Sequence, residues 1–121
     1  MVGNSKPVLV VDDQKSVRDV IKDFLELFGY KVMVACDGEK GLKLFNSQRF
    51  DLVITDIRMP VMDGIELARA IRNSDRPATP IIAITAYFGD TGARRDLFNS
   101  IVSKPFNLST LQKIVSQYVG P

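Results

Sequence analysis

Apolar residues are distributed along the chain in two patterns that alternate. Short continuous runs, such as Pro7–Val11 and Pro80–Thr85, are typical of strands that are buried on both faces. Between such runs, apolar residues recur every three or four positions, as at Val17, Ile21 and Phe24. This second spacing predicts amphipathic helices that pack one face against a core. The chain is therefore expected to alternate strands and helices.

Five strands and five helices are predicted in strict alternation. The strands are expected at Pro7–Val11, Lys31–Ala35, Asp51–Asp56, Pro80–Thr85 and Ile101–Ser103. The helices are expected at about Val17–Phe28, Asp37–Ser47, Asp63–Arg72, Gly89–Asn99 and Leu108–Tyr118. Such alternation is typical of a doubly wound α/β fold, in which helices cover both faces of a parallel sheet. The sequence contains no linker, repeat or low-complexity run, so residues 1–121 are expected to form one domain.

The predicted helices differ in the strength of their end signals. Asp63 and Glu66 form a D-x-x-E start, which is a variant of the capping box, and Asn107 is a suitable cap for the last helix. Between Gly89 and Asn99 the helical signal is weak, and glycine disfavours helix. The fourth helix is therefore expected to be short or irregular.

Composition places the chain among ordinary globular proteins. Its 121 residues are 45% hydrophobic and 25% charged, which is enough apolar material for one full core. The net charge is +2, but Lys and Arg are spread along the chain, so no basic stripe favours nucleic-acid binding. The longest apolar runs are strand-sized, and the N-terminus lacks the apolar core of a signal peptide. We therefore expect a cytoplasmic protein that neither spans a membrane nor binds nucleic acid.

Two residue types limit the chemistry of the chain. The absence of histidine excludes Ser–His and Cys–His dyads, histidine-ligated metals and a phosphohistidine carried by this chain. The single cysteine, Cys36, cannot form a disulfide within the chain, in agreement with a reducing compartment. Cys36 is better explained as a small buried side chain than as a nucleophile.

Acidic side chains follow two of the predicted strands. Asp12 and Asp13 come directly after the first strand, and Asp56 ends the third. Ligands of parallel α/β sheets bind beyond the carboxyl ends of the strands, where Thr85 and Lys104 are also expected. If the first and third strands are neighbours, their ends lie ~5 Å apart. Carboxylates so close together need a proton or a cation, and an oxygen-only ligand set favours Mg²⁺. Each aspartate taken alone would more often be a turn residue or a helix cap, and it is the gathering of acids, a hydroxyl and a lysine at one edge that favours a cation site.

The same segments resemble a known family. In order along the chain, "VLVVDDQ", "DLVITDIRMPVMDG", "IIAITAY" and "SKPF" are similar to the receiver domain of two-component response regulators. The similarity extends from Lys6 to Val119. It implies a flavodoxin-like (βα)5 fold with five parallel strands in the order 2-1-3-4-5. It also implies a phosphoacceptor signalling domain, which catalyses only its own phosphorylation and dephosphorylation.

The resemblance assigns the acids to a phosphorylation site. Asp56 would accept a phosphoryl group from a phosphohistidine on a sensor histidine kinase or a histidine phosphotransfer protein. Asp13 would bind Mg²⁺ together with Asp56 and the backbone carbonyl of Arg58. Asp12 would hold a water molecule coordinated to the metal.

Three further residues are implied in contacts with the phosphoryl group. Lys104 would reach one oxygen as a compact cation, the Thr85 hydroxyl would donate a hydrogen bond, and so would the backbone N–H of Ala86. Lys104–Pro105 is also a candidate for a cis peptide bond. Without the resemblance, Lys104 would be read as a solvated side chain and Thr85 as an ordinary strand residue.

The sequence departs from the family pattern on the side of the expected fourth helix. Ile101 stands where regulators of this kind usually have an aromatic residue that changes packing with the threonine, and the spacing from Thr85 to Lys104 is about three residues short. Arg58 and Tyr87 occupy positions that tune the lifetime of the phosphate in the family. We therefore expect intact phosphorylation chemistry and an altered output surface, in which the fourth helix is short or disordered.

Other functions remain open on the sequence alone. The main alternative is a receiver-like adaptor that binds a partner without phosphorylation. An aspartyl phosphohydrolase would need D-x-D at the end of the first strand, where this chain has Asp12, Asp13 and Gln14. A flavin-binding protein of the same strand order is disfavoured because three acids are a poor site for a flavin phosphate. A homodimer is compatible with the sequence, and the downstream effector is not specified by it.

Overall fold

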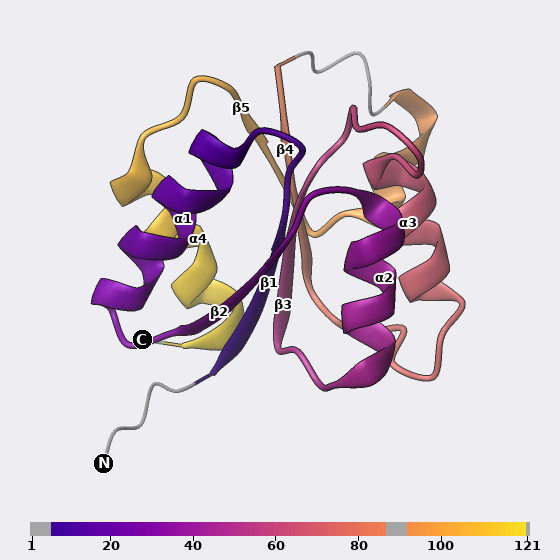
Figure 1. The fold of residues 1–121 in the computed structure, drawn as a ribbon, viewed down its shortest axis with the longest axis horizontal. Helices are drawn as coiled ribbons and strands as arrows, with labels where there is room; N and C mark the ends of the chain where they lie inside the picture. Colours follow the sequence, from indigo (N-terminus) through magenta and orange to yellow (C-terminus); the bar gives the residue numbers. More distant parts are fainter. Residues whose placement is uncertain (1–5, 87–91, 121) are drawn as a thin grey trace.

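The chain forms a three-layer α/β structure in a computed structural model that describes residues 6–86 and 92–120 (Figure 1). The central sheet has five parallel strands in the order β2-β1-β3-β4-β5. The strands are β1 (Pro7–Val11), β2 (Lys31–Ala35), β3 (Leu52–Asp56), β4 (Ile81–Thr85) and β5 (Ser100–Ser103). This confirms the predicted fold class and strand order. Because all strands run the same way, they end at one edge of the sheet.

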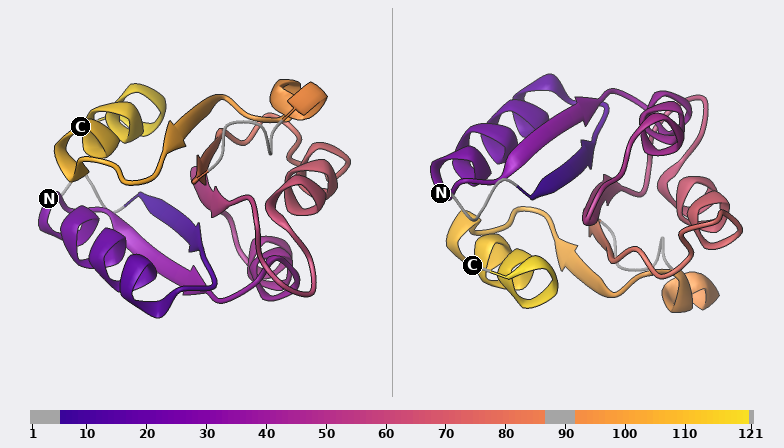
Figure 2. Two further views of the ribbon diagram at one scale, coloured as in Figure 1. Left: turned by 90° about the horizontal axis from the view of Figure 1, so that it is seen from above. Right: turned by 90° about the horizontal axis from the view of Figure 1, so that it is seen from below.

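Helices cover both faces of the sheet. One face carries α1 (Lys15–Leu27) and α4 (Leu108–Val119), and the other carries α2 (Gly38–Ser47), α3 (Gly64–Arg72) and the 3₁₀ helix η2 (Gly92–Leu97). Figure 2 shows these two groups on opposite sides of the strands.

Side-chain alternation along β1 divides the core between the two faces. Val8 and Val10 belong to the cluster under α1 and α4, whereas Leu9 and Val11 belong to the cluster under α2 and α3. All four side chains are buried, as expected for a strand covered on both faces. β1 is therefore fixed from both sides, and its last residue leads directly into the acid pair.

In the part of the chain that the structure describes, three helices begin with a side-chain cap. Asp63 and Glu66 form the predicted capping box of α3, with each side chain bonded to the backbone N–H of the other. Asp37 caps α2, and Asn107 caps α4 as predicted. The first helix is different, because its N-cap Gln14 makes no side-chain cap bond and no acidic residue lies in its first turn.

The fourth helical element is short, as predicted. In the described part of the chain it is a six-residue 3₁₀ helix, Gly92–Leu97. Its end is held by Arg72 at the C-terminus of α3, whose guanidinium donates to the Leu97 carbonyl at 2.8 and 3.1 Å and to Asn99 Oδ1 at 2.9 Å. Asn99 Oδ1 also accepts the N–H of Ile81 at 2.8 Å. These contacts fix the end of η2 from α3 and from the start of β4.

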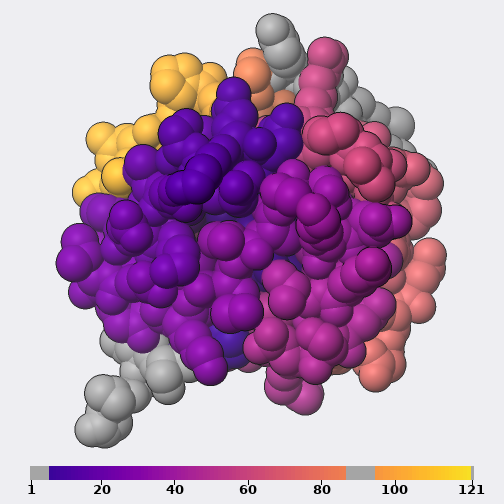
Figure 3. All heavy atoms as spheres, in the orientation of Figure 1, coloured from indigo at the N-terminus to yellow at the C-terminus, as the bar shows by residue number. Residues whose placement is uncertain are grey.

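The surface view in Figure 3 is dominated by the N-terminal half of the chain, with α1 and α2 at the front. Val20 on α1 and Phe28 at its C-cap follow the helical spacing of the apolar residues, but they are 49% and 44% exposed. The buried stripe is narrower and includes Ile21 and Leu25. Among the described residues, none of the helices has the length and apolar character needed to cross a membrane.

Candidate functional site

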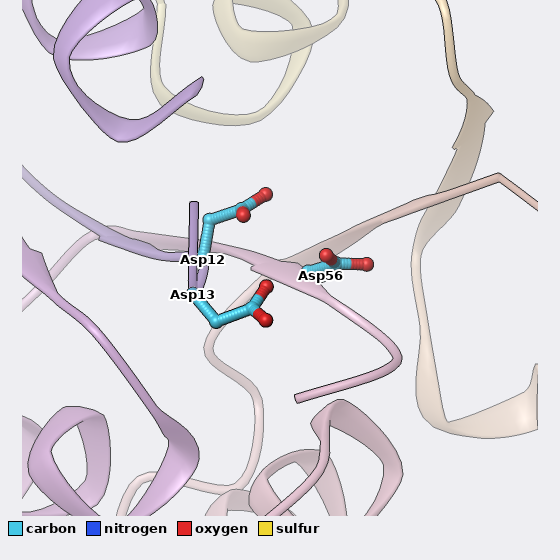
Figure 4. A group of neighbouring side chains, drawn as sticks. All are labelled: Asp12, Asp13 and Asp56. Atoms are coloured by element: carbon cyan, nitrogen blue, oxygen red, sulfur yellow. The ribbon is translucent and has the colours of Figure 1, made fainter. Parts of the chain in front are cut away.

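Three carboxylates meet at the carboxyl edge of the sheet. Asp12 and Asp13 follow β1, and Asp56 ends β3, which pairs directly with β1. One carboxylate oxygen from each residue lies within 4.8 Å of the other two. Figure 4 shows Asp12 and Asp13 at the end of β1 and Asp56 beside them at the end of β3. Asp12 and Asp56 are buried, whereas Asp13 is exposed at the rim.

Backbone groups hold the buried acids in place. Gln14 N donates to Asp12 Oδ1 at 2.9 Å, and Ile57 N donates to Asp56 Oδ1 at 2.7 Å. The Asp12 N–H itself donates to the Ala35 carbonyl at 3.2 Å, which ties the turn after β1 to the end of β2. In each buried carboxylate, Oδ1 thus accepts a backbone hydrogen bond, and Oδ2 is left for the other groups of the site.

Lys104 places a positive charge beside the two buried acids. Its Nζ lies 3.0 Å from Asp56 Oδ2 and 3.2 Å from Asp12 Oδ2. Lys104 follows β5, and its backbone N–H donates at 2.8 Å to the carbonyl of Thr85, the last residue of β4. The Lys104–Pro105 peptide bond is cis, as predicted. Partial burial lowers the pKa of Lys104, but the hydrogen bond to Asp56 and the charges of Asp12 and Asp56 outweigh it and raise that pKa above its ordinary value.

Asp12 is in an unfavourable position for a bare carboxylate. Burial raises its pKa, and the charge of Asp56 adds to this, against the opposing effects of the Gln14 N–H and of Lys104. Below the ordinary pKa of 3.8, Asp12 is protonated whether the chain is folded or not. As the pH rises through the raised folded-state pKa, the metal-free fold loses stability relative to the unfolded chain. A bound cation would offset this loss.

The donor set fits a hard divalent cation. Asp12 Oδ2 is buried and accepts no hydrogen bond, although Lys104 Nζ lies 3.2 Å away. Carboxylate oxygens of this kind, with open space for water and phosphate oxygens, are the ligands that Mg²⁺ takes in proteins. The adjoining pocket has a volume of about 280 Å³ and is lined by Asp13, Gln14, Asp56, Arg58, Thr85, Ala86 and Lys104.

The loop after β3 approaches the site closely. Gly64 N donates to the Ile57 carbonyl at 2.8 Å, and a Cβ at Gly64 would collide with the carbonyl oxygen of Asp56. Thr55 Oγ1 donates to that same carbonyl at 2.8 Å. Within the loop, Val61 has a φ of 71°, a conformation that costs energy for a β-branched residue. The backbone that carries Asp56 is therefore packed from two directions.

The other predicted residues fall into three groups. Arg58, Thr85 and Ala86 line the same pocket as Asp56. Ile101 does not line it: it pairs with Ala83 in the sheet and packs in the cluster that contains the end of η2. Tyr87 lies outside the described residues. The role of the Arg58 carbonyl as a metal ligand stays a prediction.

Sequence reasoning missed three residues around the acids. Gln14 lines the pocket, and its position directly after the acid pair could have indicated this. Arg18 Nη1 donates to the backbone carbonyl of Asp12 at 2.9 Å. A sequence signal for this role existed, because a basic residue in the first turn of a helix is unfavourable and therefore unusual. Gly64 is required beside Asp56 by a close approach that no local pattern reveals.

Comparison with known proteins places these features in a family. The model of the response regulator receiver domain matches residues 8–116. The transcriptional regulatory protein CrdR of Helicobacter pylori is 30% identical over 93% of this chain, and the sensor kinase/phosphatase LuxN of Vibrio harveyi is 30% identical over 98%. The matched region is 54% of CrdR and 14% of LuxN, so this chain spans only part of the length of such relatives.

Solved structures agree with this assignment. The response regulator TrrA of Thermotoga maritima, in complex with Mg²⁺-BeF, superposes with a TM-score of 0.86 at 37% identity, covering 93% of this chain and 98% of TrrA. The receiver domain of a sensor histidine kinase from Pseudomonas aeruginosa, with magnesium coordinated in its active-site cleft, gives a TM-score of 0.85 at 32% identity, covering 97% and 99% of the two chains. The chain described here belongs to the response regulator receiver domain family.

Proposed function

We propose that Asp56 is the phosphoacceptor of a Mg²⁺-dependent phosphorelay reaction. A carboxylate oxygen of Asp56 attacks the phosphorus of a phosphohistidine, and the phosphorus–nitrogen bond breaks. The donor imidazole keeps the electron pair and takes up a proton, and Asp56 becomes an acyl phosphate. The observation that carries this proposal is the meeting of three carboxylates with Lys104 at one edge of the sheet.

The acids after β1 provide the cation site in this proposal. Asp13 and Asp56 would hold Mg²⁺ together with the Arg58 carbonyl, and Asp12 would hold a water molecule bound to the ion. When bound, Mg²⁺ would screen the negative charge that the carboxylate and the phosphoryl oxygens share. Asp12 supports this assignment, because one of its oxygens lies within 4.8 Å of an oxygen of Asp13 and of Asp56, and its buried Oδ2 is paired with the Lys104 cation at 3.2 Å.

The opposite wall of the pocket would receive the phosphoryl oxygens. Lys104, which bonds Asp56 at 3.0 Å, would transfer this contact to a phosphoryl oxygen. Thr85 and the backbone N–H of Ala86 would donate hydrogen bonds from the end of β4. Arg58 and Tyr87 would control access of water to the phosphate. The phosphorylated pocket would then alter the surface around η2, where Ile101 packs.

The donor is proposed to be a sensor histidine kinase or a histidine phosphotransfer protein. The relatives named above include a transcriptional regulatory protein and a sensor kinase/phosphatase, which supports a place in two-component signalling. A single domain over residues 1–121 and a cytoplasmic location are part of the same proposal, and the lone Cys36 is compatible with that compartment. The proposal is compatible with a homodimer but does not require one.

Beryllofluoride binding tests the proposed function without a cognate kinase. As a mimic of the phosphoryl group, it is expected to bind the wild-type chain only in the presence of Mg²⁺, with fluorine NMR as the readout. Asp56→Asn should abolish this binding, because the acceptor oxygen is lost. Asp51→Asn is the matched control, since Asp51 lies just before the other end of the same strand.

The outcome separates the two functions that the sequence left open. Mg²⁺-dependent binding that requires Asp56 would support the phosphoacceptor. A folded wild-type chain that binds no beryllofluoride at saturating Mg²⁺ would refute it and favour an adaptor that acts without phosphorylation.

A further inference from the structure

We propose that Arg18 is a positioning residue that holds the Asp12–Asp13 peptide in the orientation needed to bind the cation, an inference that rests on the proposed function. Arg18 lies on α1, and its Nη1 donates to the Asp12 carbonyl at 2.9 Å. That carbonyl belongs to the peptide unit that joins the two acids. A bond to it restrains the plane of this unit, which sets the position of the Asp13 Cα and so limits where the Asp13 side chain can reach.

The turn that carries the acids is held at three points. The Asp12 N–H is bonded to the Ala35 carbonyl at 3.2 Å, and Asp12 Oδ1 accepts the Gln14 N–H at 2.9 Å. These two bonds fix the Asp12 amide and side chain, but neither involves the Asp12 carbonyl. The Arg18 bond supplies this third restraint, and it comes from a partly buried side chain four residues beyond Gln14.

The position of Arg18 is costly for the helix that bears it. The N-terminal turn of a helix favours acidic residues, because the partial charge there is positive. The first turn of α1 contains Lys15 and Arg18, has no acidic residue, and follows an N-cap without a side-chain bond. Local choices that oppose helix stability tend to occur where the residue serves a site. Lys15 has an ion-pair partner in Asp19 at 2.6 Å, whereas the contact of Arg18 is directed to the acid pair.

Positioning and simple electrostatics predict opposite results for the loss of Arg18. A positive charge close to a cation site repels the cation, so its removal alone would tighten Mg²⁺ binding. Loss of the restraint on the Asp12–Asp13 peptide would weaken Mg²⁺ binding, since one ligand would no longer be held in place. The sign of the change therefore identifies the role.

The test is calorimetric titration of Mg²⁺ into the wild-type chain and into Arg18→Met, Arg18→Lys and Lys22→Met, each below its own midpoint of thermal unfolding. Arg18→Met should weaken Mg²⁺ binding about tenfold, at the lower end of the range for groups that orient metal ligands. Arg18→Lys keeps a charged donor and should recover most of the affinity. Lys22→Met removes a charge from the same helix, where Lys22 pairs with Glu26, and should leave Mg²⁺ binding within about twofold of wild type.

Each result decides between the roles. Unchanged or tighter binding by folded Arg18→Met, with normal binding by the wild-type chain, would overturn the positioning role alone. Absence of Mg²⁺ binding by the wild-type chain would overturn the proposed function as well. If Arg18→Met does not fold, Arg18→Gln takes its place with the same expectation, because it also removes the guanidinium.

Discussion

Gly64→Ala is expected to destabilise the fold by about 3 kcal/mol, although alanine is normally the better helix residue. Gly64 is the first residue of α3, where the substitution would ordinarily stabilise by up to about 1 kcal/mol. Here the added Cβ meets the Asp56 carbonyl oxygen and lies 2.9 Å from Ile57 Cα, so backbone atoms must move. Because Asp56 is displaced, Mg²⁺ affinity should fall together with stability. Urea unfolding and Mg²⁺ titration measure the two effects.

Gly41→Ala is the comparison variant for this prediction. Its Cβ would meet two side-chain atoms of Val11, at 2.8 and 3.3 Å, and no backbone atom is among its three nearest neighbours. We expect a smaller loss of stability and an almost unchanged Mg²⁺ affinity. Wild-type stability in Gly64→Ala would show that the loop after β3 does not pack against Asp56 as described.

Lys104→Met is expected to change two properties of the site in opposite directions. Lys104 Nζ lies between Asp12 and Asp56, so its removal deletes the cation that competes with Mg²⁺, and Mg²⁺ should bind more tightly. Phosphorylation by a small-molecule donor such as acetyl phosphate should nevertheless slow by about 100-fold, because a charged contact to the phosphoryl oxygens is lost. Without Mg²⁺ the variant should be less stable, since buried carboxylates lose their partner.

Lys113→Met is the matched control, because Lys113 is exposed on α4. Its Mg²⁺ affinity and phosphorylation rate should equal those of the wild-type chain. A Lys104→Met variant with weaker Mg²⁺ binding, or with an unchanged rate, would contradict the role given to this lysine. The raised pKa of Lys104 keeps it charged up to at least its ordinary value of 10.5, so its contribution should not titrate near neutral pH.

Most of the fold follows from local pattern. Continuous apolar runs with polar ends located the strands within a residue or two, and β3 begins at Leu52 rather than at Asp51. The caps Asp63 and Asn107 were predictable because their bonds are made within one helical turn. The carboxylate cluster was predictable because parallel strands end at one edge.

Features set by distant contacts were less predictable. The weak signal between Gly89 and Asn99 indicated a short element, but its end depends on Arg72, which is 25 residues from Leu97 in sequence. On α1, Val20 follows the apolar spacing yet remains half exposed. Fewer residues of α1 are buried against the sheet than follow the apolar spacing in the sequence. The roles of Arg18 and Gly64 depend on contacts with other loops, which spacing alone does not reveal.

Intact-mass measurement after incubation with acetyl phosphate tests the central claim most directly, namely that Asp12, Asp13 and Asp56 surround one Mg²⁺ so that Asp56 can accept a phosphoryl group. The wild-type chain should gain the mass of one phosphoryl group when Mg²⁺ is present and none when Mg²⁺ is chelated. Asp56→Ala should gain none under either condition. Equal labelling of Asp56→Ala, or labelling of the wild-type chain without a divalent cation, would contradict the account.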